Sequence, residues 1–134
     1  VLKPPPDTPW SATHLGKIAA EKTDLPPGVL NVVPAGREVG AHLKTGLIDL
    51  QDRHALIGDV RGLGLFIGLE LVTHRATRQP AAAEASYIVE GMKERGILLS
   101  IDGPLHNVIK IKPPLVLSED DVDMALRVLD DVLQ

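Results

Sequence analysis

The chain contains no cysteine among its 134 residues. This absence excludes disulfides, thiolate metal sites and cysteine nucleophiles, and it is compatible with a reducing compartment. Aromatic residues are almost as scarce, at 2%, whereas hydrophobic residues make up 44% of the chain. We therefore expect a domain-sized body whose core consists of Leu, Ile, Val and Ala and needs no covalent cross-links.

Three further features are missing, and each excludes a class of function. No apolar run approaches the roughly 20 residues of a membrane span, and no signal-peptide pattern is present, so we expect no membrane partner and a cytoplasmic location. The net charge is -4 with scattered Lys and Arg, which argues against a nucleic-acid partner. The His and acidic residues lack the spacing of metal ligands, and we predict no metal site.

Hydrophobic periodicity predicts alternating helices and strands after a break at Pro34-Ala35-Gly36. In chain order we expect a helix to about Arg53, two strands within 56–72 that bend at Gly62 and Gly64, a helix from Pro80 to Gly96, strands at 97–100 and 108–112, and a helix capped by Ser118 and Asp121. Short connections favour antiparallel pairing. The predicted fold class is α+β, a small, mainly antiparallel sheet covered by helices, with an N-terminal helix-strand segment before it.

Three segments of this series carry a resemblance to a known enzyme family. They are residues 56–71 (LIGDVRGLGLFIGLEL), residues 94–99 (ERGILL), and residues 107–115 (NVIKIKPPL) followed by Ser118-Glu119-Asp120-Asp121. Through them, residues 36–134 resemble the C-terminal small domain of class III aminotransferases. That resemblance implies the small-domain fold of fold-type I enzymes and a parent family that depends on pyridoxal phosphate. It also implies that the Schiff-base lysine, the acidic partner of the pyridine nitrogen and the phosphate cup belong to a large domain. We therefore expect no catalytic residue and no bound cofactor in this chain alone.

Within that family the chain is most similar to the phospholyase branch, which acts on phosphoethanolamine or phosphohydroxylysine. Residues 98–104 (LLSIDGP) and 110–114 (KIKPP) carry this similarity. The resemblance implies that Lys110 is a substrate-binding residue at a position where transaminases tend to have an arginine that holds a carboxylate. A lysine is a point charge that suits phosphate or water-mediated contacts. The strand pattern is also compatible with Lys110 and Lys112 forming a solvated face opposite Ile109 and Ile111.

Residues 1–35 resemble a different family, the aldehyde dehydrogenases, in a segment of their cofactor domain. The similarity lies in residues 1–4 (VLKP), 8–12 (TPWSA) and 25–33 (LPPGVLNVV), where we expect a helix and then a short strand. It implies that Lys3 is a cofactor-binding residue that contacts the adenosine ribose of a nicotinamide cofactor. The phosphate-binding turn and catalytic cysteine of that family do not follow, so Lys3 also fits a terminal lysine without a ligand. Together with the start at Val1, this favours a fragment, a processed product or an engineered splice of two enzyme segments.

Other residues that resemble functional motifs have simpler interpretations. Gly62, Gly64 and Gly68 do not form a dinucleotide loop, because they lie within predicted strands and no helix follows to present backbone amides. Arg61 is interpreted as a structural or interface residue. The five histidines are dispersed and are interpreted as surface or capping residues, with His54 just past a helix end, where positive charge is favourable.

Three hypotheses about function remain open. In the first, the chain is a fragment or chimera carrying the small domain of a class III aminotransferase or phospholyase, which acts on amino or phosphorylated-amine substrates and is inactive alone. Its partner is then the missing large domain or a homo-oligomer partner. In the second, it is a non-enzymatic or designed module that self-associates through surface that the small domain would otherwise bury. In the third, it retains an NAD-binding remnant of an aldehyde dehydrogenase.

Overall fold

The computed structural model of the chain describes residues 14, 17–19, 21–24, 37–114 and 116–134. The described residues between 14 and 22 are helical, where a helix was predicted. Lys3, the predicted strand at 29–33 and the predicted break at 34–36 lie outside the described residues.

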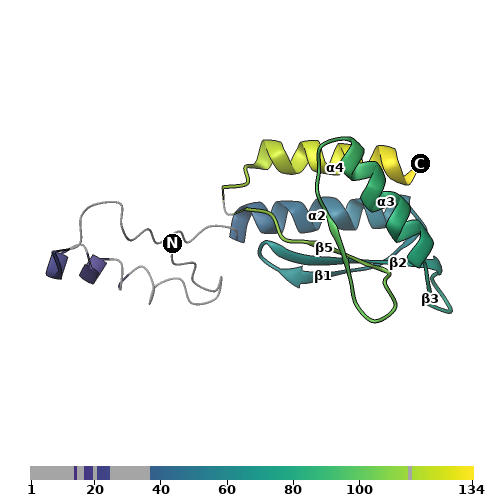
Figure 1. Ribbon diagram of the computed structural model, residues 1–134, viewed down its shortest axis with the longest axis horizontal. Coiled ribbons are helices and arrows are strands. Elements are labelled where there is room, and N and C mark those ends of the chain that lie inside the picture. The colour runs from purple at the N-terminus through teal and green to yellow at the C-terminus, as the bar shows by residue number, and fades with distance from the viewer. Residues whose placement is uncertain (1–13, 15–16, 20, 25–36, 115) are drawn as a thin grey trace.

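The part of the chain from residue 37 onward is an α+β body, as predicted (Figure 1). In chain order its elements are α2 (Arg37–Arg53), β1 (Ile57–Leu63), β2 (Phe66–His74), β3 (Gln79–Pro80), α3 (Ala82–Glu94), β4 (Ser100–Asp102), β5 (Val108–Ile111) and α4 (Glu119–Leu133). The strands form one sheet in the order β1-β2-β5-β4, with the short β3 paired to the end of β2. Every pairing is antiparallel, which confirms the predicted sheet type.

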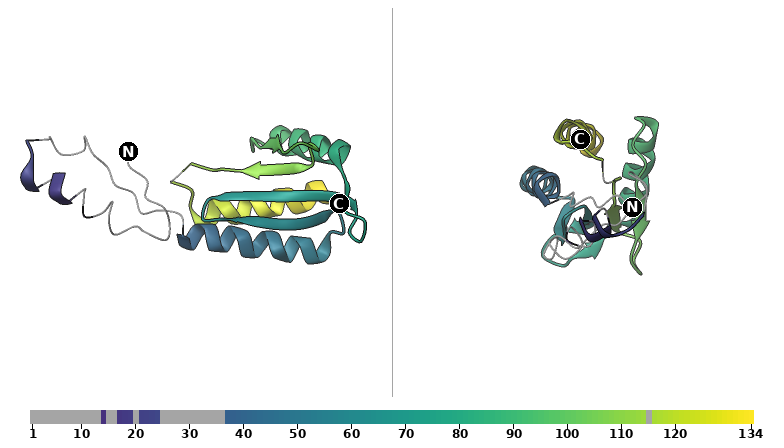
Figure 2. Two further views of the ribbon diagram at one scale, coloured as in Figure 1. Left: turned by 90° about the horizontal axis from the view of Figure 1, so that it is seen from below. Right: turned by 90° about the vertical axis from the view of Figure 1, so that its left-hand side faces the viewer.

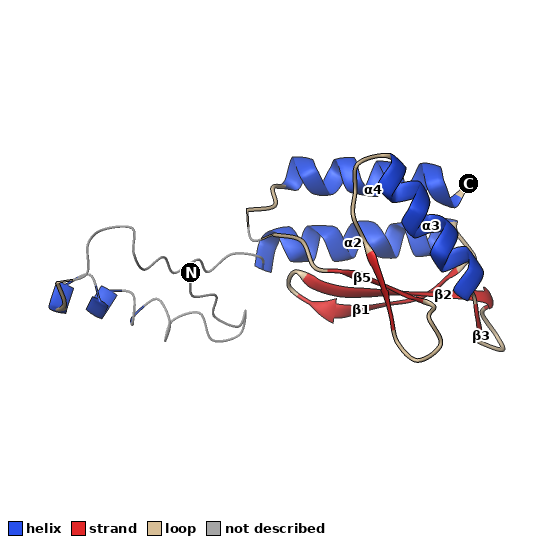
Figure 3. Ribbon diagram, viewed as in Figure 1, coloured by secondary structure: helices blue, strands red, loops and turns tan. Residues whose placement is uncertain are grey.

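The helices cover one face of this sheet. Helices α2 and α3 pack on the strands, and α4 packs on both of these helices. Figure 2 shows α2 and α4 running side by side, and Figure 3 shows both of them above the strands. The opposite face of the sheet is therefore left open, and the charged residues discussed below lie on it.

The core is aliphatic, as the composition predicted. In β2 the inward positions alternate as expected, and Ile67, Leu69 and Leu71 are fully buried. The other buried hydrophobic side chains lie mainly on the helices and include Leu43, Leu47, Leu50, Ala85, Ile88, Met92, Val122 and Leu129. Asn107 is the buried polar residue of the described core, and its side-chain amide donates to the Leu71 carbonyl at 2.8 Å. This bond lets a polar side chain remain inside the core.

Two boundaries differ from the prediction. The apolar residues 97–99 are not a strand, because the Ile97 amide donates to the Met92 carbonyl and closes the end of α3. The strand β4 begins only at Ser100. Likewise, the helix predicted from Pro80 begins at Ala82, since Pro80 is paired with Val72 in the edge strand β3. Proline is tolerated at such an edge because it has no ladder hydrogen bond to donate there.

Two helix signals of the sequence are confirmed. Ser118 caps α4, and its hydroxyl accepts a hydrogen bond from the Asp121 amide while the Asp121 carboxylate accepts from the Ser118 amide. At the end of α3, Gly96 adopts a φ of 84°, the left-handed conformation in which glycine commonly ends helices.

Candidate functional site

The pairing register aligns two cationic residues on the open face of the sheet. Arg61 is paired with Gly68, Gly68 with Lys110, and Lys110 with Ser100, so one row crosses all four main strands. Directly paired residues share a face of the sheet. Because Gly68 has no side chain, Arg61 and Lys110 stand on either side of an open floor.

A second row of residues brings carboxylates beside these cations. Asp59 is paired with Glu70, Glu70 with Val108, and Val108 with Asp102. Each of these residues is two positions from a member of the first row, so its side chain points to the same face. This side of the sheet therefore carries two positive charges, on Arg61 and Lys110, and three negative charges, on Asp59, Glu70 and Asp102. The net charge of this cluster is negative.

The cations and carboxylates form specific ion pairs. Lys110 Nζ donates to Asp102 Oδ2 at 2.8 Å, and the guanidinium of Arg61 donates to Asp59 Oδ2 at 2.9 Å and to the carboxylate of Glu70. The hydrogen bonds to Asp59 and Glu70 raise the pKa of Arg61. Two hydrogen bonds lower the pKa of Asp102. The larger effect comes from the side chain of Lys110, and the next from the backbone amide of Gly103.

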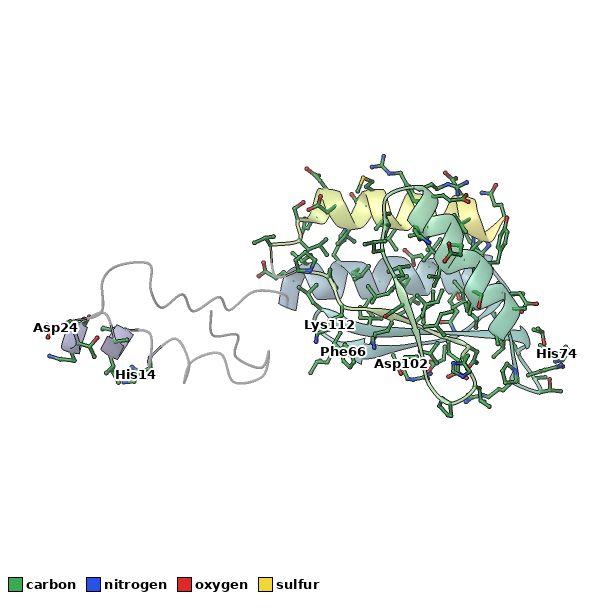
Figure 4. All side chains as sticks on the ribbon, in the orientation of Figure 1. His14, Asp24, Phe66, His74, Asp102 and Lys112 are labelled. Carbon is green, nitrogen blue, oxygen red and sulfur yellow. The ribbon has the colours of Figure 1, made fainter. Side chains whose placement is uncertain are left out.

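A shallow cavity of about 430 Å³ lies over this face. Its lining includes Arg61, Gly68, Lys110, Asp102, Val108 and Phe66. Figure 4 shows Phe66, Asp102 and Lys112 on the side of the sheet away from α2 and α4. Phe66 is 58% exposed and Leu63, its cross-strand partner, is 60% exposed. The cavity is therefore charged at its centre and apolar at one border.

The structure places Lys110 where the strand pattern predicted, opposite the buried Ile109. Whether Lys110 binds a substrate stays a prediction, as does the role of Lys3. Arg61, interpreted as structural from the sequence, makes two ion pairs within the sheet face. Asp102 and Glu70 were not predicted as members of a site. Their positions beside Lys110 and Arg61 depend on the register of the strands, which the local sequence does not specify.

A larger cavity, of about 530 Å³, lies on the helical side. It is lined mainly by apolar residues of α2, α4 and the segments that flank β4 and β5. The carboxylate at its wall, Asp121, is occupied by the cap of α4. This cavity therefore offers packing surface and lacks a set of free polar groups.

The described residues do not fit pyridoxal phosphate. That cofactor needs an enclosed lysine for its Schiff base, an acid for its ring nitrogen and a cup of donors for its phosphate. The described lysines with defined partners are Lys17 with Glu21, Lys44 with the Gly62 carbonyl, Lys93 with Glu90, and Lys110 with Asp102. The remaining described lysines, Lys22 and Lys112, are exposed. None of these arrangements supplies the enclosed lysine and its acidic neighbour together.

The described part of the chain has neither a cluster of metal ligands nor a helix that could span a membrane. Nowhere in residues 37–114 and 116–134, or in the described positions before them, do three or more His, Cys, Asp or Glu side chains gather as metal ligands. No helix in those same ranges is long and apolar enough to cross a membrane.

Comparison with known proteins identifies two matching families. Residues 30–133 match the family Aminotransferase class-III, and residues 1–46 match the Aldehyde dehydrogenase family. The second match is short and overlaps the first at residues 30–46. The assignment of residues 1–35 to the cofactor domain of that family stays a prediction.

Two relatives support the first of these matches. The alanine–glyoxylate aminotransferase 2 homolog 2 of Arabidopsis thaliana is 45% identical over 92 residues, which are 69% of this chain and 19% of that protein. The ethanolamine-phosphate phospho-lyase homolog 1 of Caenorhabditis elegans is 43% identical over 104 residues, which are 77% of this chain and 22% of that protein. This chain thus spans about a fifth of the length of these relatives.

Solved structures agree with the sequence relatives. A phospholyase from Arthrobacter in complex with phosphoethanolamine is 35% identical, with a TM-score of 0.71 over 75% of this chain and 24% of that one. An amine transaminase from an uncultivated Pseudomonas species, in its pyridoxal-phosphate-bound form, is 36% identical, with a TM-score of 0.64 over 72% of this chain and 22% of that one. The chain belongs to the class III aminotransferase family, a family that depends on pyridoxal phosphate.

Proposed function

We propose that residues 36–134 act as the small domain of a pyridoxal-phosphate-dependent class III aminotransferase or phospholyase, with Lys110 binding the anionic group of an amino or phosphorylated-amine substrate. The observation that carries this proposal is the position of Lys110. It lies at the centre of the open sheet face, beside the bare floor of Gly68 and in a cavity large enough for a small molecule.

The chemistry of lysine favours a phosphorylated amine within this range. An ammonium group is a compact point charge that binds phosphate well, whereas an arginine fork is better matched to the two oxygens of a carboxylate. The names of the Caenorhabditis elegans and Arthrobacter relatives point to the same substrate class. The Arabidopsis thaliana relative is named for an amino acid, so the broader class of amino substrates remains part of the proposal.

We further propose that a large domain supplies the chemistry and covers this face. The described lysines do not form a site for the cofactor, so the chain by itself should be inactive. Leu63 and Phe66 leave more than half of their surface in solvent next to the cavity. Exposed apolar side chains beside a charged cavity are typical of a surface that another body covers.

The binding part of this proposal can be tested by NMR on the full chain. In a titration with O-phosphoethanolamine, the amide signals of Gly68, Gly103 and Lys110 should shift together. Lys110→Ala should abolish these shifts. Lys112→Ala removes the same charge just beyond the end of β5, and this variant should retain the shifts. Shifts that persist in Lys110→Ala would contradict the assignment of Lys110.

The cofactor part has a separate test. Addition of pyridoxal phosphate to the purified chain should produce no stoichiometric Schiff-base absorption band. A stoichiometric band that disappears when a single lysine is replaced would show that this chain carries its own cofactor site. That result would remove the need for a large domain.

The exposed apolar residues also favour a second candidate, a module that self-associates. Leu63 and Phe66 on the sheet face, and Leu98, Val116 and Met124 around the helical cavity, are all exposed. If these surfaces bind a second copy, the apparent mass from light scattering should rise with protein concentration, and Phe66→Ser should lower it. A monomer at every concentration would exclude this candidate.

Tight NAD binding in calorimetry would support the third hypothesis, which concerns Lys3.

A further inference from the structure

Lys110 is already occupied by a carboxylate of its own chain. Asp102 lies diagonally across from it, since Lys110 is paired with Ser100 and Asp102 with Val108. Diagonal neighbours in antiparallel strands lie within reach of long side chains. The resulting contact joins Lys110 Nζ and Asp102 Oδ2 at 2.8 Å.

The carboxylate of Asp102 is held in place from its other side. Its Oδ1 accepts a hydrogen bond from the Gly103 amide at 2.8 Å. Gly103 has a φ of 84°, so the backbone there takes a turn that favours glycine. One oxygen therefore belongs to the turn, and the other points to Lys110.

Of the two cations on this face, Lys110 is the one whose carboxylate partner is more easily displaced. Within the part of the chain that the structure describes, Arg61 is bound by two carboxylates, those of Asp59 and Glu70, whereas Lys110 is bound by one, that of Asp102. The side chains of Lys110 and Asp102 are 34% and 57% exposed, so a small molecule can reach both partners of this pair. A ligand anion is therefore expected to displace Asp102 before it displaces the partners of Arg61.

Displacement has a consequence for the kind of ligand that fits. A plain anion on Lys110 leaves the carboxylate of Asp102 without its partner and next to a second negative charge. A ligand that also carries an ammonium group satisfies both residues, because its anionic end pairs with Lys110 and its ammonium pairs with Asp102. We infer that Asp102 is a specificity-determining residue that selects aminated anions, such as aminoalkyl phosphates, over anions of the same shape without an amine.

This inference rests on the proposed function, and it concerns the first encounter with the substrate. Amines of this kind are protonated at neutral pH, as the lysine side chain is. The Lys110–Asp102 ion pair is then opened by insertion of a zwitterion, and each charge exchanges one partner for another. The ammonium thus restores a partner to the exposed carboxylate of Asp102, the contribution of one surface ion pair that a plain anion does not make.

The test compares two probes that differ by one amine, O-phosphoethanolamine and ethyl phosphate. Their affinities for the full chain are measured from the amide shifts of Gly68 and Lys110. The unmodified chain should prefer O-phosphoethanolamine by about two- to fivefold, the range that an exposed ion pair provides. In Asp102→Asn the preference should disappear, with ethyl phosphate binding more tightly than before. The amide oxygen of the new side chain can still accept from Gly103, so the turn is retained.

Asp49→Asn is the matched control. It removes the same charge from an exposed position on α2, in the other layer of the fold. This variant should leave both affinities unchanged. If Asp102→Asn keeps the preference of the unmodified chain while Lys110→Ala abolishes binding, the role of Asp102 is wrong and the proposed function stands. If neither probe shifts Gly68 or Lys110 in any variant, the anion site of the proposed function fails and this inference fails with it.

A second measurement tests the ion pair without a ligand. The carboxyl carbon of Asp102 is followed by NMR through an acid titration in the unmodified chain and in Lys110→Ala. Since the hydrogen bond from Lys110 is the main cause that lowers the pKa of Asp102, the replacement should raise this pKa toward its ordinary value. An unchanged pKa would show that the pair does not form in solution, which overturns the inference.

Discussion

Replacement of Gly40 by alanine should destabilise the chain through a collision between two backbones. Gly40 is buried in α2, where the helix crosses the turn between β1 and β2. A Cβ atom at this position would lie 2.4 Å from the carbonyl oxygen, 2.5 Å from the carbonyl carbon and 2.8 Å from the Cα of Gly64. Gly64 has a φ of 58°, so the turn cannot easily move to another conformation.

Two opposing effects set the magnitude of this change. Alanine is favoured over glycine inside a helix by about 1 kcal/mol. Overpacking of a well-packed interior costs about 1–3 kcal/mol, and the high end applies when the obstacle is backbone, because no rotamer change relieves it. We therefore expect Gly40→Ala to lose about 1–2 kcal/mol of unfolding free energy. For a body of roughly 100 residues this lowers the melting temperature by about 4–16 °C.

Gly46 in the same helix provides the control. A Cβ atom there would lie 2.2 Å from Leu126 Cδ1, which is the end of a flexible side chain. Leu126 borders the 530 Å³ cavity, so its methyl groups have room to move. Gly46→Ala gains the same helix propensity, which offsets the cost of shifting the Leu126 side chain, and the net change in stability should be less than about 0.5 kcal/mol. Calorimetry of both variants decides: a Gly40→Ala melting point at or above that of the unmodified chain, or equal losses in the two variants, would refute the reasoning.

Three further changes have outcomes that follow from identified side-chain contacts. Asn107→Ala should lower the unfolding free energy by about 1 kcal/mol in urea titrations, since Leu71 loses one hydrogen bond but its carbonyl keeps the one from the Ala81 amide. Ser118→Ala should cost about 1 kcal/mol through loss of the cap of α4, and Ser118→Thr should retain most of it. Asp130 is held by His54 and Arg53, which lower its pKa, so its stabilisation is present above the ordinary value of 3.8 and is lost as the pH falls through the lowered value. The urea midpoint of Asp130→Asn should therefore lie below that of the unmodified chain at pH 6 and converge with it in strong acid.

The fold could be predicted where periodicity extends over several turns or strand residues. Helix α2 has a clear apolar stripe at Leu43, Leu47 and Leu50, and all three are buried. Short apolar runs are harder, because residues 97–99 have the composition of a strand although they lie in the connection after α3. The edge strand β3 was missed because two residues carry no periodic pattern, and proline there suggested a helix start instead.

The candidate site could be predicted only in part, because its geometry depends on strand register. Lys110 was identified through the resemblance to class III aminotransferases. The alternation of residues along β5 predicted that its side chain lies on the face of the sheet opposite Ile109. Its partner Asp102 lies beyond the predicted strand at 97–100, and nothing in the local sequence specifies that β4 extends to this residue. A shift of register by one position would turn a side chain to the other face of the sheet. The structure shows such a shift between Ile57 and Asp59, so the face of Asp59 could not be read from alternation along β1.

The overlap between the two family matches includes the start of a helix that packs in the α+β body. Both families match residues 37–46, which belong to α2. Leu43 is buried in the core of the α+β body, and Gly40 is in direct contact with the turn that joins β1 and β2. The same turn leads into the strands that carry Arg61 and Gly68. Residues 37–46 therefore pack as part of the α+β body, because their contacts with the turn that supports the open sheet face begin within the first turn of α2.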